Sequence, residues 1–325
     1  MAVVQIKKIF LFVLSFVTAF ILVELFLQYV IGFPTYSVEK KLTGIRGSAS
    51  GTQNIFIPNS TFFNVEGGLQ IYRRNNLGFT GLDVDTINRK EFIAILGNSY
   101  LEAYQVPPES TAVGILQISL QNGGSNYQVV NLGNSGHDPM DLLYRLYYYD
   151  QFFHFKKIIL VIPASQSDWL NRQPSLKFSP QKIVENKAGL SKYLIPLRNH
   201  SVFLDLFAKT INAKEQQGDA VPEIETPQKR QKTELKYDAE YDNKLKQVVT
   251  QYNSLYPGKI AIINIGENEL ETIPDSTKNY ILSSNIRYLW RPINKPINKI
   301  NGKGHLNTTG NRELGKTLYE LFKQD

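Results

Sequence analysis

The sequence predicts an α/β protein: a three-layer α/β/α sandwich with a mostly parallel sheet, preceded by one transmembrane helix. Two observations predict this fold class. From about residue 89, short apolar runs alternate with stretches of helical periodicity, as in parallel βαβ units. Near the N-terminus, one apolar run is long enough to cross a hydrocarbon core. The predicted domains are an anchor over residues 1–33, an extracytoplasmic lead-in over 34–88 and the sandwich over 89–325.

The predicted transmembrane helix is apolar from Ile9 to Phe33, with Glu24 as its one carboxylate. Lys7 and Lys8 precede it, so the positive-inside rule puts the N-terminus in the cytoplasm and the rest of the chain outside. A cleaved signal peptide and a buried core helix are the alternatives. The run is long for a signal peptide, and no A-x-A-like cleavage site follows it. The sequence therefore favours a single-pass anchor in the cell membrane with a periplasmic main domain.

Four apolar runs predict the strands of the parallel sheet, at residues 92–96, 128–132, 157–162 and 259–265. Amphipathic stretches predict helices at residues 110–120, 139–153 and 308–323. The second of these has a start signal, with Asp138 as N-cap, Pro139 in the first position and Asp141 in the first turn. Residues 212–236 are polar and charged, with almost no large apolar side chains, which predicts a surface insertion.

The composition excludes several classes of function. The chain has no cysteine, which rules out thiol catalysis, disulfides and cysteine zinc sites. With 4 histidines, a metal site has few ligands to draw on, and we predict no metal and no cofactor. The net charge of +7 is spread along the chain without a basic stripe interleaved with aromatics, so we predict no nucleic-acid partner.

Small and polar residues follow three of the predicted strands, where ligands bind in open α/β sheets. The first strand leads into GNSY, which puts the Ser99 hydroxyl at the carboxyl edge of the sheet. The second leads into GNSGHDP, in which Gly136 offers an unobstructed N–H. The third leads into PASQSD, in which Gln166 and Ser167 offer side-chain donors. His305, in GKGHLN before the last helix, is the candidate general base.

Each of these segments alone is an ordinary turn, but in this order they resemble the blocks of the SGNH (GDSL-type) hydrolases. The matching segments are FIAILGNSY, VVNLGNSGHDP, IPASQSDW and GHLNTTGNREL, and RRNNLGFTG is similar to a stretch in membrane-anchored members. The resemblance implies a flavodoxin-like sandwich with Ser99 as nucleophile and His305 as base. Gly136 and Ser167 would then contribute to the oxyanion site. The predicted substrate-binding residues are Asn98, Tyr100, Gln166 and His137.

Three positions depart from the family's pattern. Asn98 replaces the aspartate before the nucleophile, and Ser167 replaces the asparagine of the third block. The aspartate that usually lies two or three residues before the histidine is absent, because Gly302 and Lys303 occupy those positions. Loss of the triad acid has cost about 10⁴-fold in rate where it was tested, so the sequence predicts a Ser-His dyad. A carboxylate from elsewhere could substitute, and the unranked candidates are Asp168, Asp275 and Glu267.

The resemblance implies a membrane-anchored serine esterase or O-acyltransferase that acts on ester groups, in particular O-acetyl groups, of an envelope or exported polysaccharide. Its implied partners are a carbohydrate or other acyl ester, the membrane, and other envelope polysaccharide proteins. The alternative is a catalytically degenerate module that binds polysaccharide or assists its export. The missing aspartate and asparagine favour this alternative. The retained Ser99, Gly136 and His305 favour the enzyme.

Overall fold

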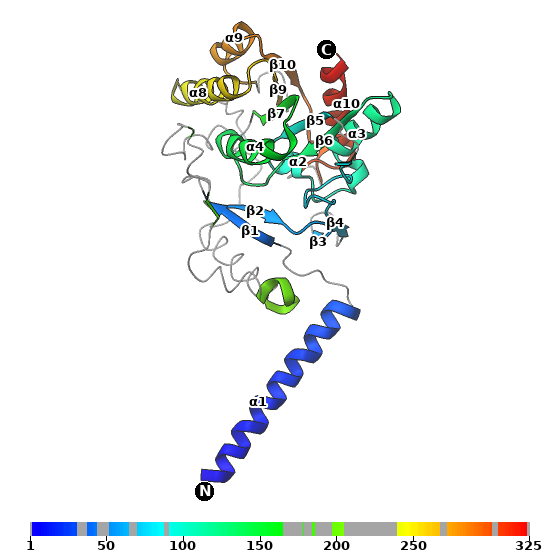
Figure 1. Cartoon of the computed structure of the whole chain (residues 1–325), viewed down its shortest axis with the longest axis vertical. Helices are drawn as coiled ribbons and strands as arrows, with labels where there is room; N and C mark the ends of the chain where they lie inside the picture. The colour runs from blue at the N-terminus through cyan, green and yellow to red at the C-terminus, as the bar shows by residue number, and fades with distance from the viewer. Residues whose placement is uncertain are drawn as a thin grey trace, which may run out of the picture.

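The computed structural model describes residues 2–30, 38–43, 52–64, 70–87, 91–164, 178, 184–185, 197–204, 239–266, 272–300 and 305–323. Figure 1 shows a long N-terminal helix, α1, projecting from a body of stacked helices and strands, with the C-terminus at the far end of that body. The predicted insertion at residues 212–236 lies outside the described residues.

A five-stranded parallel sheet forms the centre of the body. Its strands are β5 (Glu91–Leu96), β6 (Tyr127–Asn131), β7 (Lys157–Pro163), β9 (Ile260–Ile265) and β10 (Arg287–Arg291). They lie in the order β10-β9-β7-β5-β6, which is the flavodoxin-like order with β5 as the first strand. The four predicted strands are present within a residue of their predicted ends. The fifth, β10, is an edge strand of half-buried residues, RYLWR, which lacks the apolar run that marks the other four.

Helices cover both faces of this sheet and complete the predicted three-layer sandwich. On one face, α4 (Pro139–Phe153), α8 (Ala239–Leu255) and α9 (Asp275–Ser283) enclose one apolar core. On the other face, α3 (Ala112–Asn122) and α10 (Thr308–Lys323) enclose a second core. The predicted start of α4 is confirmed, because the Asp138 side chain accepts from the N–H groups of Met140 and Asp141.

Smaller elements lie in the predicted lead-in, and one of them pairs with a strand from the main domain. Strands β1 (Val38–Thr43), β2 (Thr52–Phe56) and β8 (Val184–Glu185) form an antiparallel sheet in the order β2-β1-β8. Strands β3 (Thr61–Asn64) and β4 (Gln70–Arg73) form an antiparallel pair. The boundaries of the predicted domains stay predictions.

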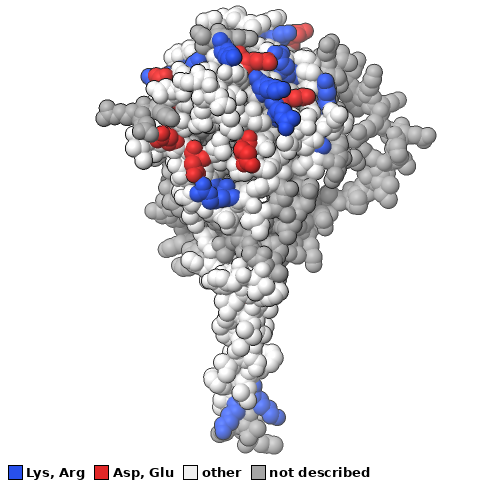
Figure 2. Space-filling view, turned by 90° about the vertical axis from the view of Figure 1, so that its right-hand side faces the viewer, with Lys and Arg blue, Asp and Glu red and all other residues white. Residues whose placement is uncertain are grey.

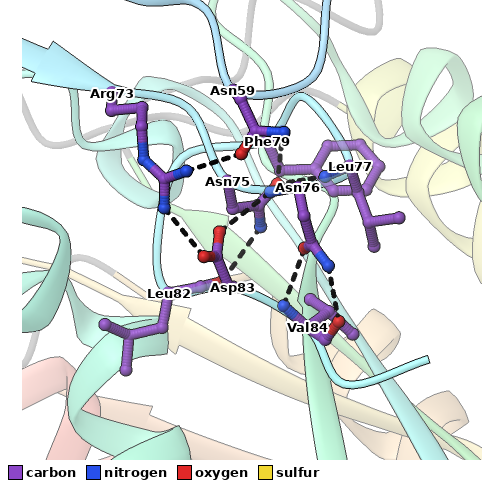
Figure 3. Close-up of polar contacts among 9 residues, drawn as sticks. All are labelled: Asn59, Arg73, Asn75, Asn76, Leu77, Phe79, Leu82, Asp83 and Val84. Carbon is purple, nitrogen blue, oxygen red and sulfur yellow. Dashed lines mark hydrogen bonds and ion pairs between the residues drawn. The ribbon is translucent and has the colours of Figure 1, made fainter. Parts of the chain in front are cut away.

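The loop after β4 is fixed by two asparagine side chains (Figure 3). The Oδ1 atom of Asn75 accepts from the N–H groups of Leu77 and Phe79, at 3.0 and 2.9 Å. Asn76 pairs with the backbone of Val84 in both directions, at 2.9 and 2.8 Å. These side-chain amides add to the backbone hydrogen bonds of the loop, so residues 74–81 of the RRNNLGFTG stretch are held in a defined conformation outside any helix or strand.

The helix α1 (Ala2–Leu25) continues as a short π-helix, η1, to Val30. Within its span from Gln5 to Val30, the most apolar window of 18 residues has a mean hydropathy of 2.6 and is not buried, and the span is long enough to cross a membrane. Figure 2 shows α1 in white along its visible length, the colour of residues other than Lys, Arg, Asp and Glu, with Lys or Arg near the end that points away from the body. An apolar helix near an N-terminus also fits a signal sequence, and a choice between the two depends on what α1 contacts.

Candidate active site

Ser99 is the first residue of a one-turn helix, α2 (Ser99–Glu102), which begins shortly after the inner strand β5. The side chain of Asn98 caps this helix by accepting from the Tyr100 N–H at 3.0 Å. Ser99 itself is half-buried, at the carboxyl edge of the sheet. The observed role of Asn98 is therefore to hold the turn that presents Ser99, and its role in substrate binding stays a prediction.

The loop after β6 packs tightly on this turn. The N–H of Asn134 donates to the carbonyl of Gly97 at 2.9 Å. A Cβ atom at Gly133 would lie 2.7 Å from the nitrogen of Glu102 and 2.8 Å from the Cβ of Leu101, so only glycine allows this approach. The serine turn and the glycine loop therefore form one unit.

The buried side chain of Asn131, the last residue of β6, ties the same unit to the lead-in. Its Nδ2 group donates to the backbone oxygen and the hydroxyl of Thr80, at 3.2 and 3.0 Å, and to the carbonyl of Leu101 at 2.8 Å. Its Oδ1 atom accepts from the N–H of Gly133 at 2.9 Å. Thr80 belongs to the RRNNLGFTG loop, so this loop is hydrogen-bonded to the strand end that carries the glycine loop of the candidate site.

Gly136 lies exposed at the tip of the second loop, with φ of +75°. Among the described residues, no group accepts from the N–H of Gly136 or from the N–H of Ser99. As the first residue of α2, Ser99 has no carbonyl within the helix to which it could donate. Backbone donors of this kind stabilise an oxyanion, which is the role that the sequence predicts for Gly136.

His305 reaches the site from the loop before α10. Its carbonyl accepts from the N–H of Ile300 at 3.0 Å, and Leu306 is fully buried beside it. The imidazole meets the ring of Tyr100 edge-on, with 6.2 Å between ring centroids. The structure thus brings His305 beside the residue that follows Ser99, although the two are far apart in sequence. A direct Ser99–His305 hydrogen bond and the substrate contacts of Tyr100 stay predictions.

The sequence analysis missed Glu102, whose buried carboxylate joins the two loops. Its Oε2 atom accepts from the Ser135 N–H at 2.7 Å and from the Ser135 hydroxyl. Glu102 is 4% exposed, whereas Ser135 lies at the surface. Ser135 precedes Gly136, and the carboxylate therefore fixes the segment that carries the candidate oxyanion N–H. No sequence pattern singles out Glu102, because a lone acidic residue in a polar turn is usually solvated.

A hydrogen-bonded chain continues from Glu102 towards the lead-in. The Tyr104 hydroxyl is hydrogen-bonded to Glu102, and the Nη2 group of Arg74 donates to it at 3.3 Å. Burial, with Glu102 as the next cause, raises the pKa of Tyr104, which keeps this hydroxyl protonated. The Arg74 guanidinium also stacks on the rings of Phe56 and Phe62, 3.7 and 4.7 Å from their centroids.

His137, a predicted substrate-binding residue, lies buried beneath the glycine loop. Its ring contacts the side-chain amide of Asn134. Burial, together with the charge of Arg145, lowers the pKa of His137 to about 3, so its imidazole is neutral at pH 7. Whether it contacts substrate stays a prediction.

The other predicted site residues lie outside the described part of the chain. These are Gln166 and Ser167 of the third block, together with the candidate carboxylates Asp168 and Glu267. Asp275, the third carboxylate candidate, is the exposed first residue of α9. Among the described residues, no group of His, Asp and Glu side chains could hold a metal ion.

No family model matches the sequence, and no curated protein matches it closely. Several solved structures are similar. The psychrotrophic esterase EstA from Pseudoalteromonas sp., inhibited by monoethylphosphonate, is 14% identical, with 72% of this chain and 97% of that chain covered and a TM-score of 0.43. The lipase/acylhydrolase from Enterococcus faecalis is 11% identical over 72% and 96%, with a TM-score of 0.43. The acetyl xylan esterase AlAXEase is 14% identical over 71% and 98%, with a TM-score of 0.39. Because these TM-scores are below 0.5, the likeness carries no argument about activity.

Proposed function

We propose that the protein is a membrane-anchored extracytoplasmic serine esterase or O-acyltransferase that acts on ester groups, in particular O-acetyl groups, of an envelope or exported polysaccharide. One observation carries the proposal. The turn of Ser99, the loop of Gly136 and the ring of His305 meet at the carboxyl edge of the sheet, and two backbone N–H groups there have no acceptor among the described residues. The class of substrate rests on the resemblance of the sequence blocks to the SGNH hydrolases.

In the proposed reaction, Ser99 Oγ attacks the ester carbonyl carbon while His305 takes the hydroxyl proton. The carbonyl oxygen becomes an oxyanion, held by the N–H groups of Ser99 and Gly136. The tetrahedral intermediate then collapses, and the sugar oxygen leaves with the proton from His305. The acyl group, now on Ser99, passes to water or to a second hydroxyl, and the same histidine assists this step. Water gives hydrolysis, and a sugar hydroxyl gives acyl transfer.

The contacts of α1 support the anchor rather than a cleaved signal sequence. Glu24 accepts hydrogen bonds from Ser201, Val202 and Phe203, and Gln28 donates to the carbonyl of His200 at 3.2 Å. A signal sequence that is removed would leave no such pairing with the mature domain.

The test is hydrolysis of p-nitrophenyl acetate by the full-length chain in detergent micelles. We expect Ser99→Ala and His305→Ala each to lower kcat/KM by about 10³-fold or more. The matched controls are Ser283→Ala and His154→Asn, at exposed positions away from the site, and they should keep full activity. Activity that survives both site substitutions would refute the Ser-His dyad. A folded chain without activity on this ester or on an acetylated xylo-oligosaccharide would favour the binding module.

A further inference from the structure

The carboxylate of Glu24 lies in an unusual place for a charged group. If the hydrocarbon core begins at Ile9, after the two lysines, about 20 residues carry α1 across it. Glu24 then lies roughly one turn inside the outer boundary of the core. Carboxylates at this depth are costly and are paired with protein groups when they occur.

Glu24 accepts a hydrogen bond from Gln28 on its own helix and further hydrogen bonds from a distant segment of the chain, residues 197–204. Its Oε2 atom accepts from the Ser201 hydroxyl at 2.8 Å and from the Phe203 N–H at 3.1 Å. Its Oε1 atom accepts from the Val202 N–H at 2.6 Å. Figure 1 shows this short helical segment beside the upper end of α1. Ser201, Val202 and Phe203 must therefore lie at the same depth in the membrane as the Glu24 carboxylate that they contact.

Aromatic packing gives an independent indication of depth. The ring of Phe203 meets the ring of Phe20 edge-on, with 5.3 Å between centroids. Phe20 lies one turn before Glu24 on α1, further into the bilayer. The side chain of Phe203 therefore extends below the carboxylate, towards the hydrocarbon core.

The surface of residues 197–204 has the chemistry of a membrane interface. Leu197 is 54% exposed and Phe203 is 40% exposed, while Val202 is fully buried. Arg198 and His200 belong to the same short segment and supply polar groups that suit the headgroup region. Transfer of exposed apolar side chains from water into lipid lowers the free energy.

We infer that residues 197–204 lie in the outer leaflet of the membrane, docked on Glu24, so that the main domain rests on the bilayer surface. This inference rests on the anchor of the proposed function and extends it, because a domain held in this way meets esters at the membrane surface. The Glu24 carboxylate accepts the hydrogen bonds that dock the segment. Inside the membrane, where water is scarce, the donors of the segment take the place of water as hydrogen-bond partners of this carboxylate.

The test uses the absence of cysteine from the chain, so that each single-cysteine variant carries one label. The full-length chain in phosphatidylcholine–phosphatidylglycerol vesicles is labelled with an environment-sensitive fluorophore at Phe203→Cys, at Phe16→Cys in α1 or at Leu282→Cys in α9. We expect blue-shifted emission and quenching by lipid-borne nitroxide at positions 16 and 203, and neither at 282. Leu282 is the matched control, since it is 52% exposed but lies on α9 of the main domain.

A second variant separates docking from anchoring. Glu24→Ala removes the acceptor, and we expect the Phe203→Cys label to lose much of its quenching while the Phe16→Cys label keeps it. In the chain that keeps Glu24, a water-like label at 203 beside a lipid-like label at 16 would overturn the inference and leave the anchor intact. A water-like label at 16 would overturn both. Neither result depends on esterase activity, which is measured separately.

Discussion

At the scale of single residues, Glu102 gives the sharpest prediction about activity. Glu102→Gln keeps the size of the side chain but puts an amide group or a neutral oxygen against the N–H and hydroxyl of Ser135. Hydrogen bonds to a charged group contribute about 1.5–3 kcal/mol, so we expect a loss of that order in the free energy of unfolding. Because the loop also carries Gly136, kcat should fall more than KM rises. Urea unfolding and ester turnover measure the two effects.

The control for this prediction is Glu109→Gln, which changes an exposed carboxylate in a neighbouring turn. It should alter stability by less than about 0.5 kcal/mol and leave kcat unchanged. If Glu102→Gln lowers stability but leaves kcat at its original value in the folded protein, the carboxylate has no part in positioning the Gly136 loop.

His137 predicts how stability depends on pH. Its pKa in the folded chain is about 3, below the ordinary value of 6.5. Between these values the unfolded chain binds a proton that the folded chain does not, so stability falls as pH falls from 6.5 towards 3. The slope from one such group is at most about 1.4 kcal/mol per pH unit. Urea unfolding at several pH values should show a shallower decline for His137→Gln, and identical slopes would contradict the burial of a neutral imidazole.

Residues differ in how far the sequence could predict them. Ser99, Gly136 and His305 stand in recognisable segments, and the structure brings their loops to one edge of the sheet. Glu102 and Arg74 carry no such signal, because their importance depends on burial and on partners distant in sequence. A lone acidic or basic residue in a polar turn is usually solvated, so periodicity and spacing give no reason to single it out.

At the scale of elements, the loop after β4 gives a prediction about stability. Gly78 has φ of +82°, and a Cβ atom there would lie 2.3 Å from the carbonyl oxygen of Phe56. Gly124 has a similar φ of +72° but open space around its Cβ position. Gly124→Ala should therefore cost only the backbone strain, about 1–2 kcal/mol, while Gly78→Ala should cost clearly more. If chemical denaturation shows equal losses in the free energy of unfolding for the two variants, the loop accommodates the added methyl group at Gly78 without further strain.

The elements that the sequence predicted are those with a strong apolar pattern. Strands β5, β7 and β9 contain apolar runs, β6 has a shorter apolar centre, and α10 has the predicted bounds of 308–323. The edge strand β10 was missed because its residues are half-buried and mixed in character. The helices α8 and α9 were also missed: α8 begins just after the polar stretch of residues 212–236, and α9 is a short helix between β9 and β10. Burial on one face of a short amphipathic helix leaves a weaker signal than burial on both faces of a strand.

At the scale of the whole molecule, the two ends of α1 differ in charge. Lys7 and Lys8 stand at its start, and the main domain follows its end. The positive-inside rule therefore predicts that position 5 faces the cytoplasm and position 282 the opposite side. Gln5 is exposed on α1 and Leu282 is 52% exposed on α9, so cysteine at either position is open to reagents.

The measurement is labelling of Gln5→Cys and Leu282→Cys by a membrane-impermeant maleimide, with a permeabilised outer membrane but an intact inner membrane. We expect label at position 282 before lysis and at position 5 only after it. Because the chain has no cysteine of its own, any signal belongs to the introduced residue. Label at position 5 in intact cells would place the lysines outside. The ester chemistry of Ser99 would then face the cytoplasm, where an exported polysaccharide is no longer the substrate.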